Sequence, residues 1–270
     1  MSGKFLHRDE APLSAQAWAK VDQAVVEAAK GQLSARRLLH VEGPYGLGFK
    51  AMPGPDQVVE GGAEGGVEVV SSAAKPVALI RKGFRLSARD MAAFEEQGVP
   101  LDLGAAADAA MACARQEDQL LFNGSKALAV QGLLNAKGTV SHDLKSWDKI
   151  GTAADDIIAA ATRLDEAGFH GPYALGLAPA RHNLLFRRYP QGDSTEIEHL
   201  RTLVTEGVIK APGIAAGGVL LASGSQYATI AVGQDLVTAF VGPADGAYEF
   251  VIFESIMLRL LAPAAVCVLK

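Results

Sequence analysis

The stretch from Ala51 to Lys75 constrains the fold most, because it predicts a long arm with little core of its own. The valine-rich segments 58–60 and 67–70 favour strands, and the glycine-rich segment 61–66 between them favours a flexible tip. A ribbon of only two strands is marginally stable by itself in water. The arm therefore needs another surface to lie against, and a neighbouring subunit is one candidate.

Helices are predicted on both sides of this arm by apolar residues at helical spacing and by capping signals. Ser14 can cap a helix that continues to about Lys30 and buries a stripe that includes Trp18. The alanine-rich segment 105–122 predicts a long helix that ends at Asn123-Gly124. Its small side chains would allow other elements to pack closely against it.

Three more helices are predicted in the middle of the chain. Thr152 can cap the first of them, which would end at Gly168. Pro179 suits the first turn of the second, and Thr195-Glu196-Ile197-Glu198 forms a capping box for the third. The stripe expected to be buried on the first of these helices is Ile157, Ile158, Ala161 and Leu164.

Beyond Val208 the pattern changes to strands. The whole order of elements lacks the regular alternation of strand and helix that parallel α/β proteins show. It favours an α+β fold with a central insertion. The expected strands are 219–223, 227–232, 235–241, 248–254 and 256–269.

The charge balance and the apolar runs argue against several classes of function. Lys and Arg total 25 and Asp and Glu total 30, so the basic excess of a nucleic-acid-binding protein is missing. The longest apolar run, 260–269, is too short for a membrane span and contains Pro263. The N-terminal residues lack the apolar run of a signal peptide. We therefore expect a cytoplasmic protein with no nucleic-acid partner and no membrane association.

The cysteines and histidines do not form a recognisable metal or redox motif. Cys113 and Cys267 are far apart in the sequence, and we interpret them as buried, reduced thiols. His182 and His199 lie in a polar stretch that is compatible with a metal or acid–base site, but we interpret it as a solvated loop. No metal site is expected.

Two short motifs match catalytic patterns but lack the local structure that those patterns need. Residues 46–51 match the Gly-x-Gly-x-x-Ala form of the dinucleotide fingerprint, but Pro53-Gly54-Pro55 prevents the helix that would hold a pyrophosphate. Ser72-Ala73-Ala74-Lys75 matches the Ser-x-x-Lys pattern, but Pro76 disfavours helical geometry at Lys75. We expect neither catalytic residues nor a cofactor.

Short segments spread over nearly the whole chain carry a resemblance to a known family. They are Ala11-Pro12-Leu13-Ser14 with Trp18, Val41-Glu42-Gly43-Pro44-Tyr45-Gly46, Gln116-Glu117-Asp118 with Phe122 and Gly124, Gly132-Leu133-Leu134, Gly171-Pro172-Tyr173-Ala174-Leu175 and Val232-Gly233-Gln234-Asp235-Leu236. Each segment alone is a weak signal, but their order and spacing together are specific. The chain resembles the encapsulin shell proteins, once described as linocin-like bacteriocins.

The resemblance implies the tailed-phage major-capsid fold, named for the Hong Kong phage, with a P-domain, an E-loop and an A-domain. Residues 1–47 would contain the N-terminal helix and the start of the P-domain, and 48–80 would be the E-loop. Residues 81–129 would hold the spine helix of the P-domain, and 130–226 would form the A-domain. The strands in 227–270 would return to the P-domain.

The resemblance also implies a groove on the inner wall of a shell, where a short C-terminal peptide of a cargo protein docks. Apolar residues would hold the aliphatic side chains of the peptide, while Arg36 and Asp235 would fix its polar groups. The alternative is that these positions are ordinary core and surface residues. The matching positions are Leu33, Arg36, Arg37, Val41, Ile230, Asp235, Leu236 and Val237.

A second implied site is a loop that lines the five-fold opening of the shell, where charged rings can select small ions. Its residues are Arg188, Tyr189, Pro190, Gln191, Gly192, Asp193, Ser194 and Thr195. One family feature is missing. Some relatives hold a flavin against an aromatic residue after the E-loop, whereas the stretch Ser87-Ala88-Arg89-Asp90 has no aromatic residue, so no flavin is expected.

The sequence therefore predicts a shell protein rather than an enzyme. Its partners would be copies of itself, in an icosahedral nanocompartment, and a cargo protein. A ferritin-like iron oxidase or a peroxidase is the expected cargo, and the resemblance alone implies it. Two alternatives stay open. A phage-derived major capsid protein would share the fold, and a soluble hydrolase with dispersed catalytic residues would form a small oligomer with a defined pocket.

Overall fold

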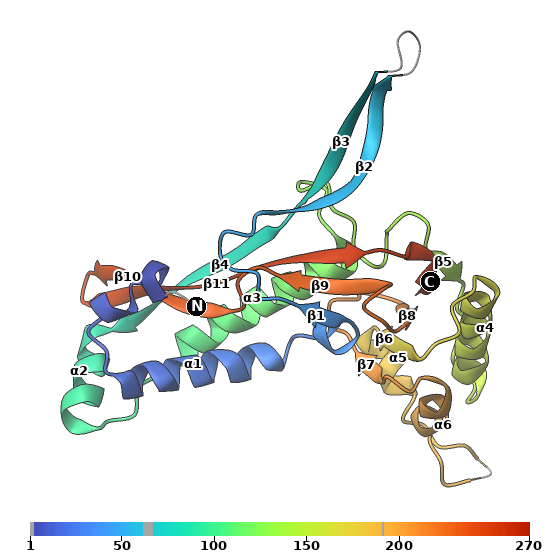
Figure 1. Ribbon diagram of the computed structural model, residues 1–270. Coiled ribbons are helices and arrows are strands. Elements are labelled where there is room, and N and C mark those ends of the chain that lie inside the picture. The colour runs from blue at the N-terminus through green and yellow to red at the C-terminus, as the bar shows by residue number, and fades with distance from the viewer. Residues whose placement is uncertain (1–2, 62–66, 191) are drawn as a thin grey trace.

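Two five-stranded sheets occupy the two ends of an elongated molecule, and a two-stranded arm projects from the first of them (Figure 1). The computed structural model describes residues 3–61, 67–190 and 192–270. A hydrophobic cluster accompanies each sheet, so the chain has two core regions. The mixture of separate helices and mainly antiparallel strands agrees with the α+β prediction.

The long strand β11 organises the first sheet. Its first part lies between β4 and β10, and its last part pairs with β9, which holds β1 at the sheet edge. The strands of this sheet are β1 (His40–Glu42), β4 (Ala78–Ser87), β9 (Ala228–Val232), β10 (Val237–Ala244) and β11 (Ala247–Leu260).

Helix α3 (Gly104–Asn123) packs against both α1 (Ala15–Lys30) and the first sheet. Close packing is achieved because many of its buried side chains are small, among them Ala106, Ala109, Ala110 and Ala114. Ser14 accepts a hydrogen bond from the Ala17 N–H and so caps α1, as predicted. Helix α2 (Ala88–Gln97) follows β4, and the short 3₁₀ turn η3 (Ala35–Arg37) connects α1 to β1.

The second sheet combines the middle of the chain with its C-terminal strand. Its strands, in order across the sheet, are β5 (Val140–His142), β12 (Val266–Leu269), β8 (Gly218–Ala222), β6 (Tyr173–Leu177) and β7 (Val208–Lys210). Its helices are α4 (Thr152–Glu166), α5 (Pro179–Leu184) and α6 (Glu196–Leu203). Pro179 occupies the first turn of α5, and the Thr195 N–H donates to Glu198 at 2.7 Å, which confirms both of these predictions.

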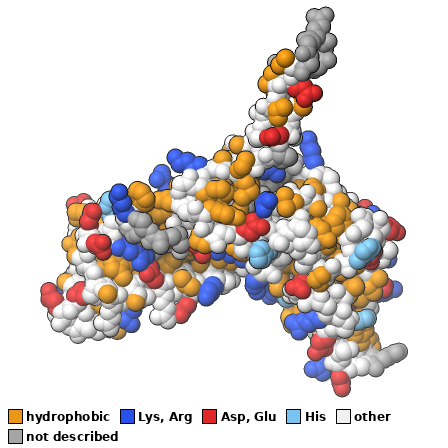
Figure 2. Space-filling model, viewed as in Figure 1, with side chains coloured by type: hydrophobic (Ala, Val, Ile, Leu, Met, Phe, Trp, Pro, Cys, Tyr) orange, Lys and Arg blue, Asp and Glu red, His pale blue; other side chains and the backbone are white. Residues whose placement is uncertain are grey.

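The arm consists of β2 (Ala51–Gly61) and β3 (Glu68–Pro76), paired antiparallel. Every residue of β3 is exposed, and hydrophobic side chains lie along the arm (Figure 2). The prediction of a ribbon without a core is therefore confirmed, although both strands are longer than expected. Residues 62–66 of the predicted tip lie outside the described residues. The arm's exposed valines are Val58, Val59, Val67, Val69 and Val70.

Two predicted boundaries are wrong. The strands expected at 248–254 and 256–269 are one continuous strand, β11, followed by a turn at Pro263–Ala265 and the separate strand β12 in the other sheet. Thr152 is the first residue of α4 rather than its cap. Gly151 is the cap instead, and its φ of +98° is a conformation that glycine adopts without strain. Ile158, expected on the buried stripe, is 48% exposed.

Candidate functional site

A buried aspartate holds the turn that carries Arg36. Asp118 of α3 accepts hydrogen bonds from the backbone N–H groups of Ser34 and Ala35 at 3.0–3.1 Å. The Ser34 hydroxyl donates to the same carboxylate. Burial raises the pKa of Asp118 above its ordinary value, although these hydrogen bonds act in the opposite direction. The turn thus places Arg36 beside α3 and β11.

Arg36 joins three carboxyl groups from three other segments of the chain. Its Nε and Nη2 donate to the two oxygens of Glu117, each at 2.8 Å. Nη2 also donates to Glu254 at 3.0 Å, and Nη1 donates to Asp235 at 2.8 Å. The side chains of Glu117 and Glu254 are 0% and 1% exposed, whereas that of Asp235 is 58% exposed. The cluster therefore links the buried core to the surface through one guanidinium.

The structure brings part of the predicted groove together around this cluster. The Leu236 N–H donates to Asp235 Oδ1 at 2.9 Å, and the side chain of Leu236 packs on the first core. Leu33 is half-buried against the same core. Val41 is 39% exposed and pairs in register with Ile230, which has no exposed surface. Ile230 therefore belongs to the core beneath the predicted groove and offers no contact surface in the isolated chain.

The polar groups of the predicted groove differ from the expectation in one respect. Arg36 and Asp235 were expected to be available to a peptide, but in the folded chain they pair with each other. Arg37 is exposed and makes one long contact, from Nη2 to the Lys210 carbonyl at 3.4 Å. Val237 is half-buried at the start of β10.

The loop predicted to line a pore lies between α5 and α6, beside the second sheet's helix α6 (Figure 1). The Tyr189 N–H donates to the Ser194 carbonyl at 3.0 Å, and the Tyr189 hydroxyl is 3.1 Å from His199 Nδ1. Gln191 lies outside the described residues. Between described residues, no side-chain hydrogen bond of Arg188, Pro190 or Asp193 holds this turn, whereas backbone contacts close it.

His182 does not fit the interpretation of a solvated loop. It is only 7% exposed and packs edge-on against Phe186, with ring centroids 5.5 Å apart. Burial lowers the pKa of His182, and the nearby charge of Lys210 acts in the same direction. His182 is therefore a neutral histidine of the core. Among the described residues, no group of three or more His, Cys, Asp and Glu side chains could hold a metal ion.

Both cysteines are buried and free, as predicted. Burial raises the pKa of each thiol, Cys113 and Cys267, to about 11. Because the thiolate is the reactive form, both groups are poor nucleophiles at neutral pH. In the part of the chain that the structure describes, no helix has the length and apolar character needed to cross a membrane.

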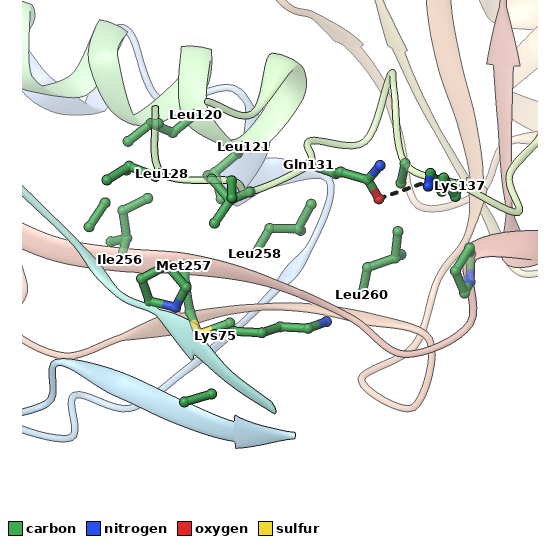
Figure 3. A pocket seen from close by; sticks show the side chains of 17 residues that line it. Lys75, Leu120, Leu121, Leu128, Gln131, Lys137, Ile256, Met257, Leu258 and Leu260 are labelled. Carbon is green, nitrogen blue, oxygen red and sulfur yellow. Dashed lines mark hydrogen bonds between the residues drawn. The ribbon is translucent and has the colours of Figure 1, made fainter. Parts of the chain in front are cut away.

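A cavity of about 560 Å³ at the root of the arm was not anticipated from the sequence (Figure 3). Most of its lining is apolar, with Leu128 on one side and Ile256 and Leu258 of β11 on another. Lys75 and Lys137 are the charged residues of its lining, which contains no carboxylate, histidine or hydroxyl from the described part of the chain. Among the described lining residues, the two lysine amines are therefore the groups that could act as a base or a nucleophile.

Comparison with solved structures defines the class of fold. A virus-like particle from Pyrococcus furiosus aligns over 94% of this chain and 99% of its own, with a TM-score of 0.74 and 24% identity. The capsid of the Myoviridae phage XM1 aligns over 86% of this chain and 88% of its own, with a TM-score of 0.59 and 14% identity. The chain has the tailed-phage capsid fold that the sequence resemblance implied.

Sequence comparison then gives the family. Residues 3–257 match the family described as "Encapsulating protein for peroxidase". The type 1 encapsulin shell protein of Myxococcus xanthus is 33% identical over 98% of this chain and 96% of its own length. A ferritin-like-encapsulin shell fusion protein of Pyrococcus furiosus is 27% identical over 77% of this chain and 56% of its own length. The chain belongs to the encapsulin family.

The sequence did not single out Glu254, and it noted Glu117 only as part of a resemblance. Glu254 stands in the strand segment 250–257, whose other residues are apolar apart from Ser255, and a charged residue in such a segment is unusual and needs a partner. That is a usable signal of a buried ion pair. Its partner Arg36 is 218 positions away, so no local pattern could have identified it.

Proposed function

We propose that copies of this chain close into an icosahedral compartment that encloses a cargo protein. The arm carries this proposal, because its valines are 49–74% exposed in the single chain. Burying one such side chain contributes roughly 1.5–3 kcal/mol. A neighbouring subunit can cover the ribbon, whereas a free subunit leaves it in water and its strand edges open. Membership of the encapsulin family supports the same conclusion.

The division of the chain into capsid segments belongs to this proposal. Residues 1–47 and 81–129 are assigned to the P-domain, 48–80 to the E-loop and 130–226 to the A-domain. Within 227–270, the strands up to Leu260 return to the first sheet. Strand β12 pairs with β5 and β8 and completes the second sheet, so we add it to the A-domain.

We further propose that a C-terminal peptide of the cargo docks around Leu33, Val41 and Leu236, next to the Arg36–Asp235 pair. Half-buried aliphatic side chains beside an exposed carboxylate can bind a peptide with both apolar and polar groups. The name of the fusion relative from Pyrococcus furiosus joins a ferritin-like part to a shell, which supports a ferritin-like cargo here. A peroxidase is the second candidate, from the description of the family.

We place the compartment in the cytoplasm and assign the chain itself no catalytic role. The loop from Arg188 to Thr195 is proposed to line the five-fold opening. If it does so, replacing its charged residues Arg188 and Asp193 should change the rate at which small ions enter the shell. Unchanged entry in an intact shell would rule out this role for the loop.

Negative-stain electron microscopy of the purified chain, expressed alone, tests the assembly. Uniform hollow particles are expected. A monomer or small oligomer at every salt concentration and pH tried would refute the shell and favour a hydrolase. Hollow particles also form from phage capsid proteins, so the protein that co-purifies with the shell distinguishes the two. Cargo loading that survives Leu236→Asp in an intact shell would refute the groove.

A further inference from the structure

The cluster around Arg36 contains more carboxyl groups than one guanidinium can neutralise. Glu117 and Glu254 are both buried, and Asp235 lies at the surface. If all three were ionised, the buried part alone would carry two negative charges against one positive charge. Buried charges without compensation are costly, so a proton on one buried carboxyl group resolves the imbalance.

Geometry assigns that proton to Glu254. Both oxygens of Glu117 accept N–H groups of Arg36, whereas the buried Glu254 Oε1 receives no hydrogen bond from any described residue. Burial raises the pKa of Glu254 to about 9, and the charge of Glu117 and a hydrogen bond between the two carboxyl groups act in the same direction. A hydrogen bond between two carboxyl groups requires one proton, and Glu254 has an oxygen left over to carry it.

We propose that protonated Glu254 is a positioning residue for cargo docking, because it leaves Arg36 available to hold Asp235 and, through Asp235, the backbone of Leu236. The inference rests on the proposed cargo groove and adds a group that controls its shape. Glu254 does not touch the cargo in this arrangement. It acts through a chain of contacts, from Arg36 to Asp235 at 2.8 Å and from Asp235 to the Leu236 N–H at 2.9 Å.

Loss of the proton places two buried carboxylates on the same guanidinium. Arg36 is then attracted inward, toward Glu117 and Glu254. Asp235 can be released at the least cost, because its carboxylate is already more than half exposed to water. Its release removes the hydrogen bond to the Leu236 N–H and loosens the turn between β9 and β10. Docking and the order of this turn should therefore weaken together as the pH rises.

Other titratable groups lie near Glu254 on the elements packed against β11. Helix α3 contributes Cys113 and Asp118 besides Glu117, and β4 contributes Lys82, whose charge acts on Cys113. Burial raises the pKa of Cys113 to about 11, above the range in which Glu254 loses its proton. Strands β9 and β10, which pair with β11, contain no ionisable residue. The comparison with Glu254→Gln therefore identifies whether a step in this region reports Glu254.

Hydrogen–deuterium exchange in the purified full-length chain tests the proposal. The exchange rate is measured from pH 7 to pH 10 in fragments that span residues 233–238. Protection is the exchange rate of an unstructured peptide at the same pH divided by this measured rate, which removes the base catalysis of exchange itself. We expect protection at the Leu236 amide to be almost completely lost at one pH unit above the pKa of Glu254, because only about a tenth of the molecules then keep the proton and the rest exchange at nearly the unstructured rate. Glu254→Gln, which cannot ionise, should remain protected throughout.

Glu249→Gln provides the matched control. Glu249 lies on the same strand and pairs with Arg85 at the surface, so this variant should keep the wild-type profile. A step in the wild type and in Glu249→Gln that is absent from Glu254→Gln supports the proposal. A flat wild-type profile, or an unchanged step in Glu254→Gln, overturns it. The assay needs no cargo and can be read on the full-length chain whether or not it assembles, so its result is separate from those of the assembly and cargo-loading experiments.

Discussion

Replacing Arg36 with leucine should destabilise the folded chain by about 3–5 kcal/mol, the usual cost of breaking a buried ion pair by removing one partner. The reason lies in Glu117, which has no exposed surface and receives hydrogen bonds on both oxygens from Arg36. Without Arg36, Glu117 keeps a buried charge that neither water nor a cation neutralises. The loss is expected at pH 7, where Glu254 is neutral and adds no second charge.

The corresponding change in melting temperature follows from the size of the chain. An unfolding entropy of about 2.1 cal/mol/K per residue gives about 0.57 kcal/mol/K for a chain of 270 residues. The melting temperature should therefore fall by about 5–9 °C, measured by differential scanning fluorimetry at pH 7 and one fixed heating rate.

Arg37→Leu is the matched control, because Arg37 is the adjacent residue and its one hydrogen bond to the described part of the chain is long, at 3.4 Å. Its melting temperature should change by about 1 °C or less, as for most surface substitutions. The double variant Arg36→Leu with Glu117→Leu should recover much of the lost stability, since it leaves no unpaired charge. Equal losses for the two single arginine variants, or no recovery in the double variant, would refute the reasoning.

Three further predictions concern the arm, one glycine and the thiols. Val70→Asp should leave the subunit folded but shift it from shell to smaller species in size-exclusion chromatography, because a charge then lies where a neighbour packs. Gly217→Ala should abolish soluble expression, because φ is +69° and the added Cβ would lie 2.0 Å from the Leu269 carbonyl oxygen. Cys113 and Cys267 should stay unreactive toward a disulfide reagent at pH 8 until denaturant is added, and rapid reaction in the native shell would contradict their burial.

Local signals in the sequence predicted local structure well. The cap at Ser14, the alanine-rich helix and the capping box at Thr195 all depend on residues within one or two helical turns of each other. The error at β11 has a non-local cause. Ser255 looks like the end of a strand, but its N–H donates to the Gln234 carbonyl at 2.8 Å and its carbonyl accepts the Gly233 N–H, also at 2.8 Å. A distant turn therefore lets the strand continue.

The candidate site shows the same limit. The resemblance named Arg36, Asp235 and Leu236, and the fold brings these three together. It did not identify the buried partners of Arg36, because Glu117 and Glu254 are 81 and 218 positions away. It also placed Ile230 in the groove, although a residue paired in the middle of a covered sheet has no surface to offer. One sequence indicates which residue types are unusual, whereas only the fold shows which of them meet.

The arm and the groove both leave apolar side chains at the surface. Exposed apolar side chains occur elsewhere too, such as Phe186 and Val241, but the arm gathers several of them on one ribbon without a core. In the arm, five valines remain exposed, and beside Arg36 a more than half-exposed carboxylate adjoins a half-buried leucine. Such surfaces lower the free energy of an assembly only when another chain covers them. The arm is long and regular, which suits repeated contact with identical subunits, whereas the groove is small and polar at one end, which suits a single peptide. Disrupting one should therefore leave the other intact: a shell that assembles without cargo, or a subunit that binds the cargo peptide without assembling.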